Sequence, residues 1–194
     1  MKSSLLYTCI VVTAACTTRD AATSALPGGG AFTTGDTISA SVTLDDGGGG
    51  TSSVARIVIA STPGLCSDAG ATPPIDRAQQ KFITLELADV AGATTTTPTA
   101  AGTYAIYPNT GSRPAKSASF VTGSLDADCM TVDAADASGQ SGTVTLASVT
   151  GDAFAGSYDV VLNTGDHVTG SFTPRACPAL RTAVASTATH RCAR

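Results

Sequence analysis

The stretch from 142 to 174, GTVTLASVTGDAFAGSYDVVLNTGDHVTGSFTP, constrains the fold most, because it has the pattern of three consecutive antiparallel β-strands. Apolar residues fall on alternate positions within three runs, Thr143–Val149, Ser157–Leu162 and Val168–Thr173. A period of two residues is typical of strands that bury one face. Clusters of Gly, Asn and Asp separate the runs, and these residues readily adopt the positive φ angles of tight hairpin turns. We therefore expect three strands joined by hairpins here.

Further runs upstream are predicted to be strands as well. They are Ile38–Leu44, Val54–Ala60, Phe82–Val90, Gly102–Tyr107 and Ser119–Leu125. The composition agrees, since Thr, Ser, Ala and Gly dominate and Glu86 is the only glutamate, whereas helices favour Leu, Lys and Glu. We expect an all-β domain, an antiparallel β-sandwich of seven or eight strands, with a small up-and-down β-barrel as the alternative.

Alternation also assigns side chains to the two faces of a strand. In Val54–Ala60, Ile57 and Ile59 fall on one face and Arg56 and Val58 on the other. In Phe82–Val90, the side chains expected to face inward are Ile83, Leu85 and Leu87, and those expected to face outward are Thr84, Glu86 and Ala88. The segments predicted to be loops are Ser61–Lys81, Ala91–Ala101 and Asp126–Gly139.

The first residues have the three-part build of a secretory signal peptide, with a short basic start and an apolar core too short to span a membrane. The core ends in Thr13-Ala14-Ala15-Cys16, which resembles the lipobox of bacterial lipoproteins. That resemblance implies cleavage before Cys16 and acylation of its thiol and new amino group, palmitate included. Thr13 departs from the Leu that the motif favours, and an ordinary signal cut after Ala25 is the alternative. Residues 1–15 are then the signal and 16–36 a flexible tether to a β domain at 37–177.

Charge is unevenly distributed along the chain. The net charge is −4, which argues against nucleic acid as a partner. Residues 17–174 carry 15 acidic and 6 basic side chains, whereas residues 175–194 carry four arginines and no acid. We expect 178–194 to be a basic, solubilising tail that lies on its own acidic domain. The alternative is an anchor for an anionic surface.

Several short motifs together resemble one type of protein. They are Leu65-Cys66, Gly102-Thr103-Tyr104, Asp126-x-x-Cys129, the segment Ser141–Leu146, Gly156-Ser157-Tyr158-Asp159 and Gly170-Ser171-Phe172 followed by Cys177. With the lipobox-like start, this pattern is similar to uncharacterised cell-surface lipoproteins common in myxobacterial genomes, over roughly residues 54–177. The resemblance implies a β fold and a location in the cell envelope, on the outer membrane, and it carries no known activity.

The chain lacks a convincing catalytic or metal-binding set. Gly139-Gln140-Ser141-Gly142 fails as a nucleophile elbow, because Thr143 stands where the motif needs Gly. The two histidines, His167 and His190, do not suggest a Ser/His/Asp site, and His190 with Cys192 supplies only two metal ligands. We therefore expect no cofactor, no metal and no enzymatic activity.

Two other groups of residues were weighed as binding sites. The first is an acidic loop with the oxygen ligands that Ca²⁺ favours, but its spacing breaks the EF-hand pattern, so a solvated loop is favoured. Its members are Asp126, Asp128, Asp133 and Asp136. The second is an aromatic platform for carbohydrate, which would use Tyr104, Tyr107 and Tyr158. We expect Tyr104 and Tyr158 to face the core instead.

Four cysteines remain to pair in an exported chain once Cys9 leaves with the signal and Cys16 is acylated. If successive strands simply reverse direction, Cys66 and Cys177 lie at one end of the domain and Cys129 at the other. We therefore predict the disulfide Cys66–Cys177. Cys129 is then free or joined to Cys192.

These observations favour a non-enzymatic envelope lipoprotein anchored to the membrane through Cys16, either structural or binding an unidentified envelope partner. A carrier of a small apolar ligand in the interior of a barrel is the alternative. A hydrolase with an acid pair in a cleft is a remote one.

Overall fold

The structure is a computed structural model that describes residues 26–27, 32–45, 50–186 and 189–194. Ten strands form one sheet, in the order β10-β9-β8-β6-β7-β4-β2-β1-β11, with β5 paired to β4. The strands of this sheet are β1 (Asp36–Asp45), β2 (Thr51–Ala60), β4 (Lys81–Ala91), β5 (Thr94–Thr96), β6 (Gly102–Ile106), β7 (Lys116–Ser124), β8 (Ala137–Thr150), β9 (Ala153–Leu162), β10 (His167–Phe172) and β11 (Arg175–Ala176). A second, two-stranded sheet pairs β3 (Ile75–Arg77) with β12 (Arg191–Ala193). The helices are α1 (Leu65–Ala69), α2 (Ala179–Ala185) and the 3₁₀ turn η1 (Asp133–Ala135).

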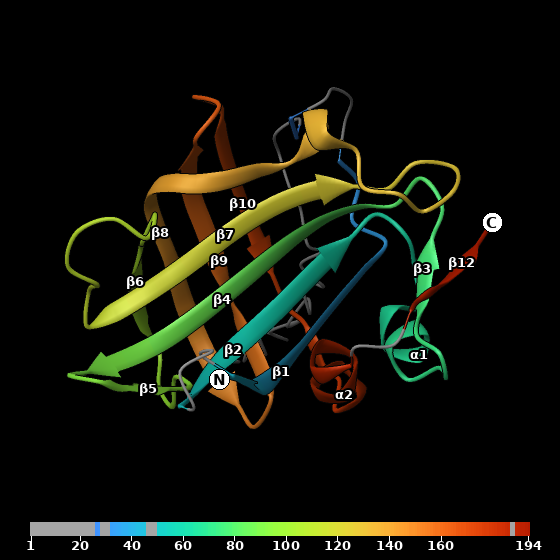
Figure 1. The fold of residues 1–194 in the computed structure, drawn as a ribbon. Helices are drawn as coiled ribbons and strands as arrows, with labels where there is room; N and C mark the ends of the chain where they lie inside the picture. The colour runs from blue at the N-terminus through green and yellow to red at the C-terminus, as the bar shows by residue number, and fades with distance from the viewer. Residues whose placement is uncertain (1–25, 28–31, 46–49, 187–188) are drawn as a thin grey trace, which may run out of the picture.

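The all-β prediction is confirmed, and each predicted run contains a strand. The large sheet curls into a half-barrel: β2, β4 and β7 run diagonally across the front of Figure 1, with β8, β9 and β10 behind them. The sheet is mixed rather than purely antiparallel. Strand β6 runs parallel to β7, and β11 runs parallel to β1.

The interior of the half-barrel is a packed apolar core. Ile83, Leu85 and Leu87, the side chains predicted to face inward, are fully buried there, and Ile57 and Ile59 of β2 join them. They pack with side chains from strands β6 to β10, including Tyr104, Phe120, Phe154, Tyr158 and Phe172. Side chains therefore fill the interior where a carried ligand was hypothesised.

A polar contact draws the turn between β8 and β9 onto β1. The Ser39 hydroxyl donates to the carbonyl oxygen of Asp152 at 2.6 Å, and the Ser41 amide donates to the Asp152 carboxylate at 3.1 Å. Arg181 of α2 also donates to that carboxylate. Because β1 and β8–β9 lie far apart in the strand order, this contact helps to hold the sheet in its curled shape.

The predicted tether at 16–36 is too long. Leu26 and Phe32 are each 5% exposed and belong to the main core, and β1 begins at Asp36. These two residues lack a neighbouring strand pattern, so their burial could not be read from periodicity. The signal peptide 1–15, Cys16 and the segment up to residue 25 lie outside the described residues.

The C-terminal segment 178–194 is folded, which corrects its prediction as a tail. Helix α2 packs Leu180 against the outward face of β1 and β2, in a second core with Ile38 and Val54. As expected for a basic segment that lies on its acidic domain, Arg181 pairs with Asp152 and Arg194 with Asp128 at 2.7 Å, and just before the segment Arg175 pairs with Asp36 at 2.6 Å. The region thus forms an accessory layer on the outer face of the sheet.

Asp36 joins this outer layer to the sheet. Its carboxylate accepts hydrogen bonds from the backbone amides of Gly64 and Leu65, at 3.1 and 2.9 Å, and from Arg175. Those amides begin α1 and have no partner within such a short helix, so the carboxylate satisfies them. Asp36 therefore fixes where α1 starts on the edge of β1.

The predicted disulfide Cys66–Cys177 is present, with Cα atoms 5.6 Å apart. Cys66 lies shortly after β2, whose last residue pairs with Asp36, and Cys177 directly follows β11, which pairs with Ile38. Both cysteines therefore meet at the start of β1. The strand order used to predict the pair was wrong, however, because β6 and β7 are parallel rather than opposed. The second disulfide joins Cys129 to Cys192, one of the two alternatives left open.

Candidate functional site

The outward face of β1, β2 and β4 forms the floor of a groove. Strand register places Ile38, Val58 and Thr84 side by side in one row across these strands. In the next row Arg56 lies opposite Glu86, and the two form an ion pair. Thr84 and Glu86 were predicted to face outward, and Arg56 and Val58 were predicted to share the face opposite Ile57 and Ile59; the structure confirms both assignments.

Phe82 closes the other end of this floor. It lies opposite Gly123 of β7, and a Cβ at that glycine would come within 2.5 Å of the Phe82 ring. A glycine there leaves room for the ring over the neighbouring strand. Gly123 therefore sets the position of Phe82 in the groove.

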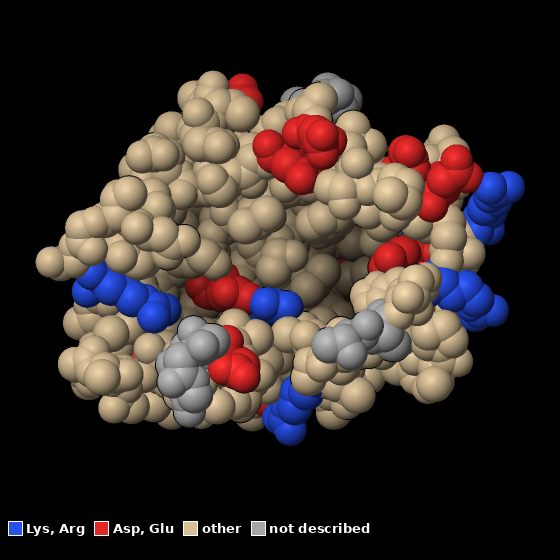
Figure 2. Space-filling view, viewed as in Figure 1, with Lys and Arg blue, Asp and Glu red and all other residues tan. Residues whose placement is uncertain are grey.

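Segments predicted as loop and tail form the walls. Helices α1 and α2 stand on one side, and the β3–β12 sheet stands on another. The groove has a volume of about 350 Å³, and Figure 2 shows this face hollowed between the strands and the lobe that carries α1 and β3. The apolar side chains that line it include Ile38, Val58, Leu65, Phe82, Leu125, Leu180 and Val184.

Among the described residues, each ionisable side chain that lines the groove has a hydrogen-bonding or ion-pair partner within the protein. Besides Arg56, these are Asp68, Asp76 and His190. Arg77 donates twice to the Asp68 carboxylate, both at 2.7 Å, and His190 lies 2.9 Å from Asp76. The hydrogen bond and the negative charge of Asp68 raise the pKa of Arg77 above its ordinary value. Asp68 is only 4% exposed, so loss of Arg77 would leave a buried carboxyl group without its ion-pair partner.

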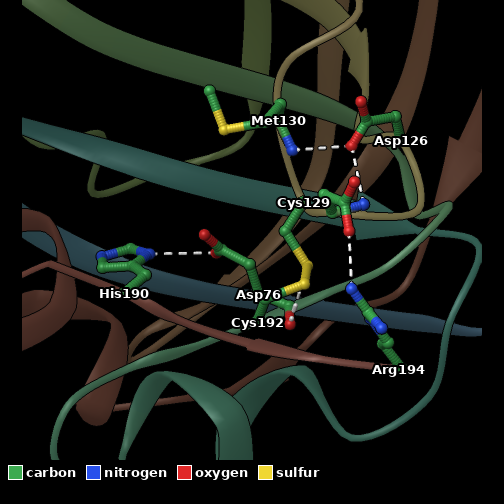
Figure 3. The surroundings of a disulfide bond; sticks show 8 residues. Asp76, Asp126, Cys129, Met130, His190, Cys192 and Arg194 are labelled. Atoms are coloured by element: carbon green, nitrogen blue, oxygen red, sulfur yellow. Dashed lines mark hydrogen bonds and ion pairs between the residues drawn. A yellow bond between two sulfur atoms is a disulfide. The ribbon is translucent and has the colours of Figure 1, made fainter.

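The disulfide Cys129–Cys192 holds the wall formed by the β3–β12 sheet in place (Figure 3). It ties β12 to the loop after β7, and β12 pairs in parallel with β3 over three residues. The Asp126 carboxylate shapes that loop by accepting the amides of Asp128 and Met130, at 2.8 and 2.9 Å. The acidic loop thus positions Cys129. Within the described ranges, no group of three or more His, Cys, Asp or Glu side chains could hold a metal ion.

The residues considered for catalysis do not come together. Ser141 and His167 flank Val161 on opposite sides, two strand spacings apart, which is roughly 10 Å. That separation is too long for a serine to transfer its proton to a histidine. His167 instead contacts Asp159, with 2.6 Å between Nε2 and Oδ1, on an exposed face.

Two of the three tyrosines considered as a carbohydrate platform lie in the core, as predicted. Tyr104 is fully buried and Tyr158 is 3% exposed, stacked near Phe120 and Phe172. Burial raises the pKa of the Tyr104 hydroxyl, which donates to Asp89 at 3.2 Å. Neither tyrosine ring can serve as an exposed platform.

The fold and the groove define an all-β domain, a half-barrel with an accessory layer on its outer face. In comparisons with family models, curated proteins and solved structures, nothing matches this chain. Within the part of the chain that the structure describes, no helix is long and apolar enough to cross a membrane. Function is therefore argued from the groove.

Proposed function

We propose that this chain is a non-enzymatic lipoprotein of the cell envelope, anchored through Cys16 in the outer membrane, whose groove binds an envelope ligand or partner. The groove carries the proposal, because it is the one place described above where an apolar floor, an aromatic side chain and a few polar groups converge. The two disulfides support the location, since they indicate an oxidising compartment outside the cytoplasm.

The buried position of Leu26 supports a domain held close to the membrane. If Cys16 carries the lipid, nine residues separate it from Leu26. A fully extended chain of that length spans at most about 30 Å. The proposed anchor therefore keeps Leu26, and the core that buries it, within roughly that distance of the membrane surface.

The anchor is tested by replacing Cys16. The Cys16→Ser variant is expected to leave the membrane fraction and to take up no labelled palmitate, because a thioether-linked lipid can no longer form. Cell fractionation and palmitate labelling of wild type and variant measure this. Equal sedimentation and equal labelling of the two proteins would contradict the anchor and leave binding by the groove as a separate question.

Binding is tested with a variant whose larger side chain fills the groove, purified from the native envelope. Thr84→Phe adds a ring at the centre of the floor, whereas Thr143→Phe makes the same change on an exposed position of β8, outside the groove. Mass spectrometry of the purified proteins is expected to find a co-purifying species with wild type and Thr143→Phe, and to lose it with Thr84→Phe. The same species on all three proteins would mean that the groove is not the binding site.

A further inference from the structure

The size of the groove limits what it can hold. Its volume of about 350 Å³ lies at the low end of the range of ligand pockets. A water molecule's share of liquid volume is about 30 Å³, so the groove has space for roughly a dozen non-hydrogen atoms. A small molecule, or one end of a larger one, fits this space.

The floor favours an apolar body with one polar group. Ile38, Val58 and Phe82 provide apolar surface, and its burial contributes about 25 cal/mol for each Å² removed from water. Thr84 of β4 lies beside Val58 of β2 in the floor of the groove. Its neutral hydroxyl can both donate and accept a hydrogen bond. A hydroxyl or carbonyl on the ligand would satisfy it.

The paired charges disfavour an ionic ligand. An anion at Arg56 would lie beside the Glu86 carboxylate, which already accepts from Nη2 of Arg56 and repels a second negative charge. A cation at Asp68 would have to displace Arg77, and breaking that largely buried ion pair is costly. An uncharged ligand disturbs none of these pairs.

We infer that the ligand of the groove is an uncharged molecule, or molecular end, of about a dozen non-hydrogen atoms, with an apolar body and one hydroxyl or carbonyl group. This inference rests on the proposed function, since it specifies the ligand of the same groove.

The experiment compares three ligands that share one chain and differ in charge: 1-decanol, decanoate and decylammonium. The full chain with Cys16→Ser avoids detergent, and isothermal titration calorimetry measures the affinity of each ligand. We expect decanol to bind at least about tenfold more tightly than either ion, which corresponds to about 1.4 kcal/mol. Equal or tighter binding of either ion, or no binding of decanol, would overturn the inference.

Variants locate the binding. Thr84→Phe is expected to abolish decanol binding, Thr84→Val to weaken it a few-fold through loss of the hydroxyl, and Thr143→Phe to leave it unchanged. Unchanged decanol binding by Thr84→Phe would place the site elsewhere and overturn the inference. The three-ligand comparison uses the protein with Thr84 unchanged, so it decides whether charged ligands bind even if Thr84→Phe does not fold.

The two proposals fail in different ways. If the ions bind as tightly as decanol while the native species still depends on Thr84, the groove binds and only the inferred ligand class is wrong. If the native species does not depend on Thr84, the proposed function is wrong as well.

Discussion

The two disulfides of this protein hold regions with opposite surroundings. Cys66–Cys177 lies in the outer core, where Cys177 is fully buried beside β1. Cys129–Cys192 lies at the rim of the groove, with Cys192 exposed near the end of the chain. The first joins the accessory layer to the sheet beside β1, and the second ties β12, in one wall of the groove, to the loop after β7. The comparison indicates that one disulfide supports the fold and the other supports the shape of the groove.

The largest effect is expected from removing the buried disulfide. The double variant Cys66→Ala/Cys177→Ala opens a link between residues 111 positions apart, which costs about 4–5 kcal/mol in the chain-entropy model. It also leaves a gap in the core under α2. The free energy of unfolding from urea denaturation measures the loss. A loss no larger than that of the matched variant Cys129→Ala/Cys192→Ala would remove the contrast between the two regions.

The exposed disulfide is expected to have a smaller and more local effect. Without it, β12 is held by three residue pairs with β3 and by exposed ion pairs such as Arg194–Asp128, each worth about 0–1 kcal/mol. The freed segment can leave while the rest stays folded, so we expect Cys129→Ala/Cys192→Ala to cost about 2–3 kcal/mol.

Hydrogen exchange checks where this change acts. The amides of Arg191, Cys192 and Ala193 are expected to lose protection in that variant, whereas those of β8 and β9 keep theirs. Loss of protection throughout the sheet would show that the exposed disulfide supports the whole fold, contrary to the comparison.

The same substitution in each region sharpens the contrast further. Asp36→Asn replaces a carboxylate that accepts hydrogen bonds from two amides at the start of α1 and from Arg175. Because this side chain is only 14% exposed, we expect the free energy of unfolding to fall by about 2 kcal/mol. Asp128→Asn removes the charge beside Arg194 on a side chain that is 69% exposed, with an expected loss below about 1 kcal/mol. Thermal and urea unfolding of the two variants test this, and equal losses would contradict it.

The sequence was informative about the strands and less so about what covers them. Long alternating runs predict β1 to β10 except the short β3 and β5, and they place Thr84 on the outward face and Arg56 with Val58 on one face of β2. A strand of three residues such as β12 shows no period, and α1 has only five residues, too few for a helical pattern. Those short elements build the walls, so the floor of the groove was predictable and the groove was not.

The partner of each strand is also beyond what alternation can show. Ala105 and Ile106 of β6 pair in parallel with β7, although consecutive strands were assumed to reverse. Alternation is the same in parallel and antiparallel strands that bury one face, so it cannot distinguish them. The predicted pair Cys66–Cys177 is present for a different reason from the one used to predict it. Both residues adjoin the start of β1, whereas the prediction only counted strand directions.

The smallest effect concerns pH and the contact that draws β8–β9 onto β1. Partial burial acts to raise the pKa of Asp152, but hydrogen bonds from Arg181 and Ser41 outweigh it and hold the pKa below its ordinary value of 3.8. The unfolded chain therefore binds the proton more readily than the folded one. The stability that Asp152 contributes is present above the unfolded pKa and is lost as the pH falls through the folded pKa.

Because Arg181 is half exposed, solvent screens this pair, and we expect a contribution below about 1 kcal/mol. Urea denaturation of wild type and Asp152→Asn as the pH is lowered from 6 into the acid range checks it, since the variant has no carboxylate to protonate. The wild type should lose its advantage over Asp152→Asn as the pH falls. A constant difference between the two proteins at every pH would show that the carboxylate's charge does not stabilise the closed sheet.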